Sequence, residues 1–157
     1  MKAAELQAII AQAEREGWTE LDLSGNDLET LPPEIGRLQS LESLILGKKL
    51  EDYEIVGDRV LQKVSSNKFK TLPIEMLHLS NLRKLDISGN PLGNIPDVVM
   101  QILHLEELIL IRAELTEIPD AIVNLANLTQ LSLKFQPNQR NTRCDRQLSQ
   151  SHAALPQ

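Results

Sequence analysis

The sequence contains few aromatic residues, a lone cysteine and no long apolar run. Only 3% of its 157 residues are aromatic, so the core has to be built from aliphatic side chains. Cys144 excludes an internal disulfide, and nothing requires an oxidising compartment. Glu5 precedes any apolar stretch of signal-peptide length, and no segment reaches the roughly 18 apolar residues of a membrane span. We therefore expect a soluble, cytoplasmic protein.

Positive charge is also scarce. Lys and Arg total 16 whereas Asp and Glu total 22, which gives a net charge of −6 at pH 7. Proteins that bind nucleic acid or anionic lipid depend on clustered Lys and Arg side chains. The charge balance therefore predicts neither a nucleic-acid partner nor a membrane partner.

What the sequence does contain is an internal repeat of 23 residues. The repeats start at Trp18, Leu41, Leu82, Leu105 and Leu128. The unit reads L-x-x-L-x-L-x-x-N-x-L-x-x-L-P-x-x-I-x-x-L-x-x, and the second copy carries 18 extra residues between its two halves. A fixed period of this length indicates a solenoid, in which each unit buries its apolar side chains against its neighbours.

Each position of the unit has a physical reason. The L-x-L centre alternates with a period of two, which predicts a short inward-facing strand, and stacked copies form a parallel sheet. The asparagine that follows can satisfy backbone groups at the turn, although the fourth copy has Ala113 there. The proline suits a return segment outside any strand ladder. The I-x-x-L spacing after it predicts a helical or 3₁₀ turn on the convex side.

These residues resemble the leucine-rich-repeat family. The 23-residue period with L-P-x-x-I is similar to the intracellular repeats of bacterial Roc–COR (Roco) GTPases and of plant Ras-group repeat proteins, and the resemblance covers Trp18 to about Lys134. The segment from Gly17 to Ser24 is similar to the opening of the bacterial Roc–COR repeats, whose GTPase and COR portions are absent from this sequence. The resemblance implies an α/β solenoid: a right-handed superhelix with a concave parallel β-sheet, short helical or 3₁₀ convex turns and an N-terminal capping helix.

Residues 1–17 precede the repeats and are predicted to form that helix. Leu6, Ile9, Ile10 and Ala13 share one stripe, and Gly17 stands where a helix would end in the left-handed conformation. We interpret the helix as a cap that shields the first repeat from water. The alternative is a helix that binds a partner.

The repeats extend over residues 18–135, and the pattern then fails. Residues 136–157 are polar and rich in Gln, which predicts a disordered tail. One explanation is a longer repeat protein that was cut or frame-shifted near residue 135. Without a cap, the last repeat would expose Leu131 and Leu133, so we expect self-association through this end.

An insertion at residues 48–66 interrupts the second repeat. The spacing of Val56, Val60 and Val64 is roughly helical, with Tyr53 extending the apolar side, so we expect a loop with a helical turn rather than a degenerate extra repeat. Insertions in repeat proteins often bind partners, which makes Tyr53, Val56 and Val60 candidate binding residues. The alternative is a segment that only packs on its neighbours.

The outward-facing strand positions define a concave surface with an apolar patch. Ile109 and Ile111 are expected side by side, with Ile45 two strands away at about 10 Å. Charged positions rim the patch. The predicted partner-binding residues are Asp22, Ile45, Lys84, Asp86, Glu107, Ile109 and Ile111. Such an apolar face is expected to be covered, either by a partner or by the insertion folded over it.

No residue pattern points to catalysis, to a metal or to a cofactor. His78 and His104 have no recurring carboxylate or cysteine beside them, which argues against a metal site. Asp22 and Asp86 lie on non-adjacent repeats and lack a third group. We therefore predict a protein-interaction module that binds a protein partner without catalysis or cofactor. The alternative is an autoregulatory N-terminal repeat fragment of a Roc–COR-like GTPase.

Overall fold

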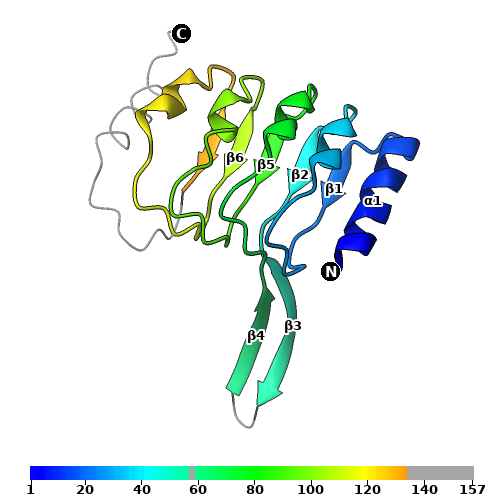
Figure 1. The fold of residues 1–157 in the computed structure, drawn as a ribbon. Coiled ribbons are helices and arrows are strands. Elements are labelled where there is room, and N and C mark those ends of the chain that lie inside the picture. Colours follow the sequence, from blue (N-terminus) through cyan, green and yellow to red (C-terminus); the bar gives the residue numbers. More distant parts are fainter. Residues whose placement is uncertain (57–58, 134–157) are drawn as a thin grey trace, which may run out of the picture.

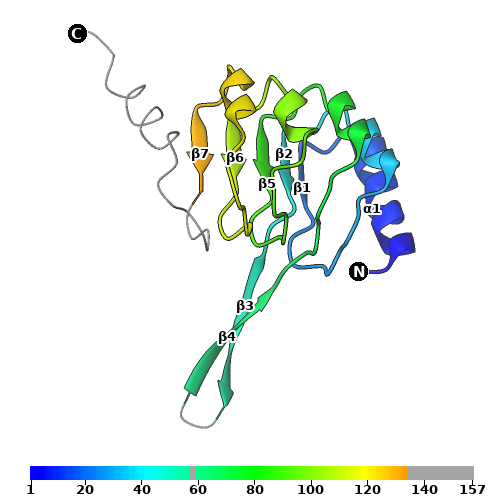
Figure 2. The same cartoon turned by 60° about the vertical axis from the view of Figure 1, so that its left-hand side comes forward.

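Five short parallel strands form a sheet along one side of the molecule. The structure is a computed structural model that describes residues 1–56 and 59–133, with the backbone alone for residues 49–64. The strand order is β1-β2-β5-β6-β7. These strands are β1 (Glu20–Asp22), β2 (Ser43–Ile45), β5 (Lys84–Asp86), β6 (Glu107–Ile109) and β7 (Gln130–Ser132). Figures 1 and 2 show them side by side, with β7 labelled in Figure 2.

The strands pair in the register that the repeat predicts. Leu21 aligns with Leu44, Leu44 with Leu85, Leu85 with Leu108, and Leu108 with Leu131. The first four of these leucines are at most 2% exposed. Each unit covers the leucines of its neighbours, so the sheet confirms the predicted solenoid.

The second layer consists of four 3₁₀ helices on the convex side. They are η1 (Pro33–Arg37), η2 (Ile74–His78), η3 (Val99–Gln101) and η4 (Asp120–Asn124). Each helix contributes a buried apolar side chain to an aliphatic core between the two layers, namely Ile35, Met76, Val99 and Ile122. The convex 3₁₀ turns therefore follow the prediction from the I-x-x-L spacing.

Buried asparagines connect neighbouring repeats where the strands end. Asn67 is fully buried, and its side chain makes four hydrogen bonds to the backbone. It accepts from the N–H groups of Asn26 and Leu28 and donates to the carbonyl oxygens of Leu23 and Leu46, at 2.8–3.0 Å. One repeat further on, the side chain of Asn90 makes three of the corresponding bonds: it accepts from the N–H of Phe69 and donates to the carbonyl oxygens of Leu46 and Ile87. These bonds confirm that the amide satisfies backbone groups at the turn.

The helix α1 (Ala3–Glu16) covers the N-terminal end of the solenoid. Leu6, Ile10 and Ala13 are buried against the first repeat. The helix ends at Gly17, which has a φ of 66°, in the left-handed conformation that glycine adopts without a steric penalty. The predicted capping helix is therefore present, with its apolar stripe facing the repeats.

The insertion forms a β-hairpin, so the predicted loop with a helical turn is wrong. Strands β3 (Lys49–Val56) and β4 (Arg59–Ser65) pair antiparallel, with a register shift between Leu50 and Tyr53. The hairpin forms a separate two-stranded sheet. In both Figure 1 and Figure 2 it projects from the edge of the solenoid where β2 ends. The tail at residues 136–157, predicted to be disordered, lies outside the described residues.

Candidate functional site: the concave sheet face

The concave face is formed by the outward positions of the five strands. In its central column, Asp22 aligns with Ile45, Ile45 with Asp86, Asp86 with Ile109, and Ile109 with Ser132. Acidic and apolar residues therefore alternate across the first four strands. Asp86 lies between Ile45 and Ile109, so the apolar patch is divided by a carboxylate.

The isoleucines of this face are only partly buried. Ile45, Ile109 and Ile111 all keep part of their surface exposed. The hairpin does not lie across them, because it points away from the sheet in both views (Figures 1 and 2). This placement disfavours the alternative in which the insertion covers the patch. Among the described elements, the face is open to an external partner.

Asp22 and Asp86 each have a structural role that the sequence did not reveal. Oδ1 of Asp22 accepts a hydrogen bond from the N–H of Ser24 at 2.8 Å, and Oδ1 of Asp86 accepts one from the N–H of Ser88 at 2.9 Å. Each carboxylate thus holds the turn after its own strand. The second carboxylate oxygen of each residue has no hydrogen-bond partner among the described residues.

Gly47 leaves room for the Asp86 carboxylate on the neighbouring repeat. A Cβ at residue 47 would lie 2.9 Å from Oδ1 of Asp86, closer than real Cβ contacts allow. The missing side chain therefore leaves the space that this carboxylate occupies. Gly47 follows β2 at the position that Ser24 and Ser88 occupy in their repeats, and the repeat pattern did not single it out. Gly47 and Ser88 occupy the same position in their repeats, and this equivalence does not indicate that Gly47 lies against Asp86.

Polar side chains beside the central column are connected across three strands. Nζ of Lys84 lies 3.1 Å from Oε2 of Glu107, and the side chain of Gln130 donates to Oε1 of Glu107 at 3.0 Å. Glu107 is therefore neutralised by its neighbour Lys84. Glu20, Asp22 and Asp86 form no ion pair with any described residue. The face thus has an excess of negative charge at its N-terminal half.

The candidate residues of the insertion are placed by the hairpin backbone. Tyr53 aligns with Gln62, Val56 with Arg59, and Val60 with Ile55. All three predicted residues therefore lie on the projecting hairpin, away from the concave isoleucines (Figure 1). The two predicted binding regions form separate surfaces.

An ion pair fixes the chain where it returns from the hairpin. Nζ of Lys68 lies 2.7 Å from Oδ1 of Asp27. The hydrogen bond and charge of Lys68 lower the pKa of Asp27 below its usual value, and Asp27 in turn raises the pKa of Lys68. The pair joins the turn of the first repeat to the turn of the second.

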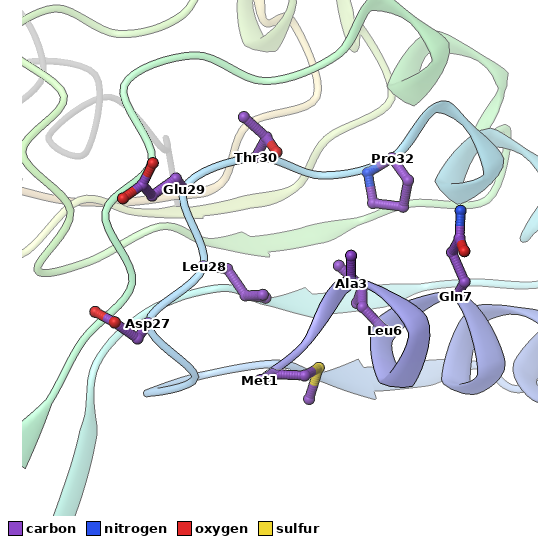
Figure 3. A pocket seen from close by; sticks show the side chains of 9 residues that line it. All are labelled: Met1, Ala3, Leu6, Gln7, Asp27, Leu28, Glu29, Thr30 and Pro32. Atoms are coloured by element: carbon purple, nitrogen blue, oxygen red, sulfur yellow. The ribbon is translucent and has the colours of Figure 1, made fainter.

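A cavity of about 230 Å³ lies between α1 and the first repeat (Figure 3). Leu6 and Leu28 form its apolar part, and Asp27 and Glu29 lie on the side away from the helix. Since Asp27 is paired with Lys68, the cavity does not present a cluster of free charges. We interpret this cavity as a packing gap between the capping helix α1 and the first repeat.

Three further observations concern a metal site, a histidine and a membrane-spanning helix. In residues 1–56 and 59–133 there is no group of three or more His, Cys, Asp or Glu side chains that could hold a metal ion. Nε2 of His104 lies 2.8 Å from the carbonyl oxygen of Leu79, as expected for a packed histidine. The same part of the chain has no helix that is both long and apolar enough to cross a membrane.

Comparisons with known proteins agree with the fold. Models of the leucine-rich-repeat family match residues 18–38 and residues 80–137. A leucine-rich-repeat protein of Leptospira interrogans has a similar structure, with 28% identity and a TM-score of 0.50 over 80% of this chain and 34% of that one. An internalin of Listeria monocytogenes has 20% identity and a TM-score of 0.42 over 69% of this chain and 33% of that one. No curated protein sequence matches.

The stacked units and the open inner face define a solenoid repeat protein. The two family matches and the Leptospira structure show that the chain contains leucine-rich repeats and has the fold of a leucine-rich-repeat solenoid. Leucine-rich-repeat domains generally mediate protein–protein interaction. The chain spans about a third of the length of the solved structures that it matches.

Proposed function

We propose that this chain binds a partner protein through its concave face and the projecting hairpin, without catalysing a reaction. The observation that carries the proposal is the partly exposed set of Ile45, Ile109 and Ile111 on a face that no described element covers. Exposed apolar side chains on a rigid sheet, with charged residues around them, are typical of a protein-binding surface. A cytoplasmic location is part of this proposal.

The hairpin is proposed as the second binding element. Its two strands pair with each other and with no other described strand, so each presents an outer edge at which a further strand could pair. Such edges bind an added strand readily. Tyr53, Val56 and Val60 are the hairpin residues that we expect to contact the partner.

Substitution of the isoleucines tests the concave face. The Ile109→Asp and Ile111→Lys double variant should lose capture of the partner from a lysate, identified by mass spectrometry, because charge is placed in the apolar contact. Ile74→Asp with Val123→Lys is the matched control, since both residues are exposed on the convex side. Unchanged capture by the concave variant, with a native-like thermal transition, would overturn the proposal.

The second proposal concerns the family. The similarity of residues 17–24 to Roc–COR proteins supports a role as the autoregulatory repeat segment of a GTPase of that type. In this case the partner is a G domain. Binding of a purified Roc–COR G domain to the isoleucine patch would support it, and capture of unrelated proteins alone would contradict it.

A further inference from the structure

The central column of the concave face alternates in chemistry at a regular spacing. Across β1, β2, β5 and β6 it reads Asp22, Ile45, Asp86 and Ile109, in direct register. Neighbouring strands lie about 4.8 Å apart, so residues of the same kind recur at about 10 Å. An α-helix advances about 5.4 Å per turn, so two turns advance about 11 Å. A helix laid across the strands therefore presents one residue to each strand.

We infer that the partner segment is an α-helix that lies across the strands and carries cationic and apolar residues on alternate turns. This inference rests on the proposed function and names the class of partner for that face. A lysine or arginine at i and i+7 would face Asp22 and Asp86, and leucines or isoleucines at i+4 and i+11 would face Ile45 and Ile109.

The charge of the face supports a cationic helix. Lys84 is already paired with Glu107 at 3.1 Å, whereas Glu20, Asp22 and Asp86 have no ion pair among the described residues. The carboxylates of the column are also held in place, because each accepts a backbone N–H from the following turn. A carboxylate that is already ordered loses less entropy when it binds a cation.

The length of the face fits a helix of about three turns. Three strand steps of about 4.8 Å separate Asp22 from Ile109, a span of about 14 Å. An extended partner strand fits less well, since its same-face residues recur at about 6.7 Å and lose register with the column. Gly47 contributes by leaving room for the Asp86 carboxylate beside the path of the helix.

A set of designed peptides tests the alternation. The probe is a stapled helical peptide with lysine at i and i+7 and leucine at i+4 and i+11 in an Ala and Gln background. One control peptide has the same composition with lysine at i and i+4 and leucine at i+7 and i+11, and another has glutamate in place of lysine. At low salt, fluorescence anisotropy should show at least about tenfold tighter binding of the alternating lysine peptide than of either control. Equal binding of the three peptides would overturn the inference.

Charge-neutral variants of the protein test the same contact. Asp22→Asn with Asp86→Asn keeps the Oδ1 acceptor that each turn requires and removes only the negative charge. This variant should bind the alternating peptide about tenfold more weakly, with an unchanged circular dichroism spectrum. Asp97→Asn with Asp120→Asn, two exposed positions on the convex side, is the matched control and should bind as the wild type does.

The two proposals fail in different ways. If the isoleucine double variant loses its captured partner while the Asp22→Asn and Asp86→Asn variant keeps full affinity for that partner and for the peptide, the helix inference is wrong and the concave interface stands. If the isoleucine double variant also keeps full capture, the concave interface itself is wrong.

Discussion

At the scale of single residues, the side chains of the buried asparagines join neighbouring repeats through hydrogen bonds to the backbone. Asn67 is fully buried and bonds four backbone groups, three in the first repeat and one in its own repeat. Replacing it with alanine leaves buried N–H and C=O groups without that partner. We expect Asn67→Ala to lower the free energy of unfolding by about 3 kcal/mol, measured by urea denaturation.

A second asparagine provides the control for this loss. Asn81 is exposed, and its side chain makes a hydrogen bond of 2.8 Å to the carbonyl oxygen of Gln39. Asn81→Ala should therefore cost less than about 1 kcal/mol. An equal loss of unfolding free energy for the two substitutions would show that the hydrogen bonds of the buried asparagines are not a main source of stability.

The turn of the fourth repeat lacks the buried asparagine of the second and third repeats. Ala113 stands in the asparagine position, and its backbone carbonyl accepts the N–H of Leu92 at 3.2 Å. Arg112 before it has a φ of 55°, in the region where the equivalent Gly25 and Gly89 have 67° and 69°. A residue with a Cβ is strained there. In this turn a backbone carbonyl therefore replaces the asparagine side chain as the acceptor, and Arg112 adopts an unfavourable φ.

Restoring the usual turn should stabilise the protein. Ala113→Asn alone should add about 1 kcal/mol to the free energy of unfolding by supplying the amide. Adding Arg112→Gly should contribute up to about 1 kcal/mol more by relieving the left-handed strain. Both changes are read from the midpoint of urea unfolding. A midpoint below that of the wild type for the double variant would contradict this account of the turn.

Residue roles could be predicted from the sequence only where the repeat defines them. The amide at Asn67 was predictable, because its position recurs every unit and its chemistry suits a turn. The hydrogen bonds from Ser24 to Asp22 and from Ser88 to Asp86 were not predictable. An outward-facing aspartate gives the same sequence pattern whether its carboxylate accepts a hydrogen bond from the next turn or binds a partner protein. The contact of Gly47 with Asp86 depends on a neighbouring repeat that is far away in sequence.

At the scale of elements, the hairpin is the part that sequence patterns misassigned. Val56, Val60 and Val64 are four residues apart, and a spacing of four fits a helix and also a strand with a period of two. Two features favoured the strand: valine is β-branched, and Gly57-Asp58 is typical of a two-residue hairpin loop. The spacing alone did not decide between the two structures.

Deletion of the hairpin should leave the solenoid folded. Removing residues 49–66 joins Lys48 to Asn67 and restores the L-x-x-N spacing of the other units. Lys48 should be changed to glycine in this variant, because the equivalent Gly25 and Gly89 have positive φ. We expect a cooperative thermal transition and an unchanged sheet signal in circular dichroism. Loss of cooperativity would show that the hairpin is part of the folding unit.

The ion pair of Asp27 and Lys68 gives a pH dependence with a defined sign. The pKa of Asp27 is lowered, so the stabilisation is present above the usual pKa of aspartate and is lost as the pH falls through the lowered value. The pKa of Lys68 is raised, so the stabilisation also disappears as the pH rises through that value. In a carboxyl NMR titration, Lys68→Gln should return the pKa of Asp27 towards its usual value of 3.8. No change in the Asp27 pKa would contradict the pairing.

At the scale of the whole molecule, the period of 23 residues made the architecture predictable. Leucines that recur at this spacing are buried only when the units stack, so the sheet and the 3₁₀ layer follow from one pattern. The capping helix was predicted separately, from the apolar stripe before Gly17. The outward positions of the concave face, from Asp22 to Ile111, were predictable from the repeat, and their role in binding stays a prediction. The direction in which the hairpin projects was not predictable, because the sequence does not indicate whether a hairpin packs on the sheet or points away from it. Self-association through Leu131 and Leu133 stays a prediction.

The central claim is that the inner face of the solenoid binds the partner. Methyl NMR of protein labelled at isoleucine tests it most directly, with the partner identified by capture. The account predicts that the methyl signals of Ile45, Ile109 and Ile111 shift or broaden on addition of the partner, while Ile74, which is 58% exposed on the convex side, stays unchanged. A shift of Ile74 with no change at the three concave isoleucines would contradict it.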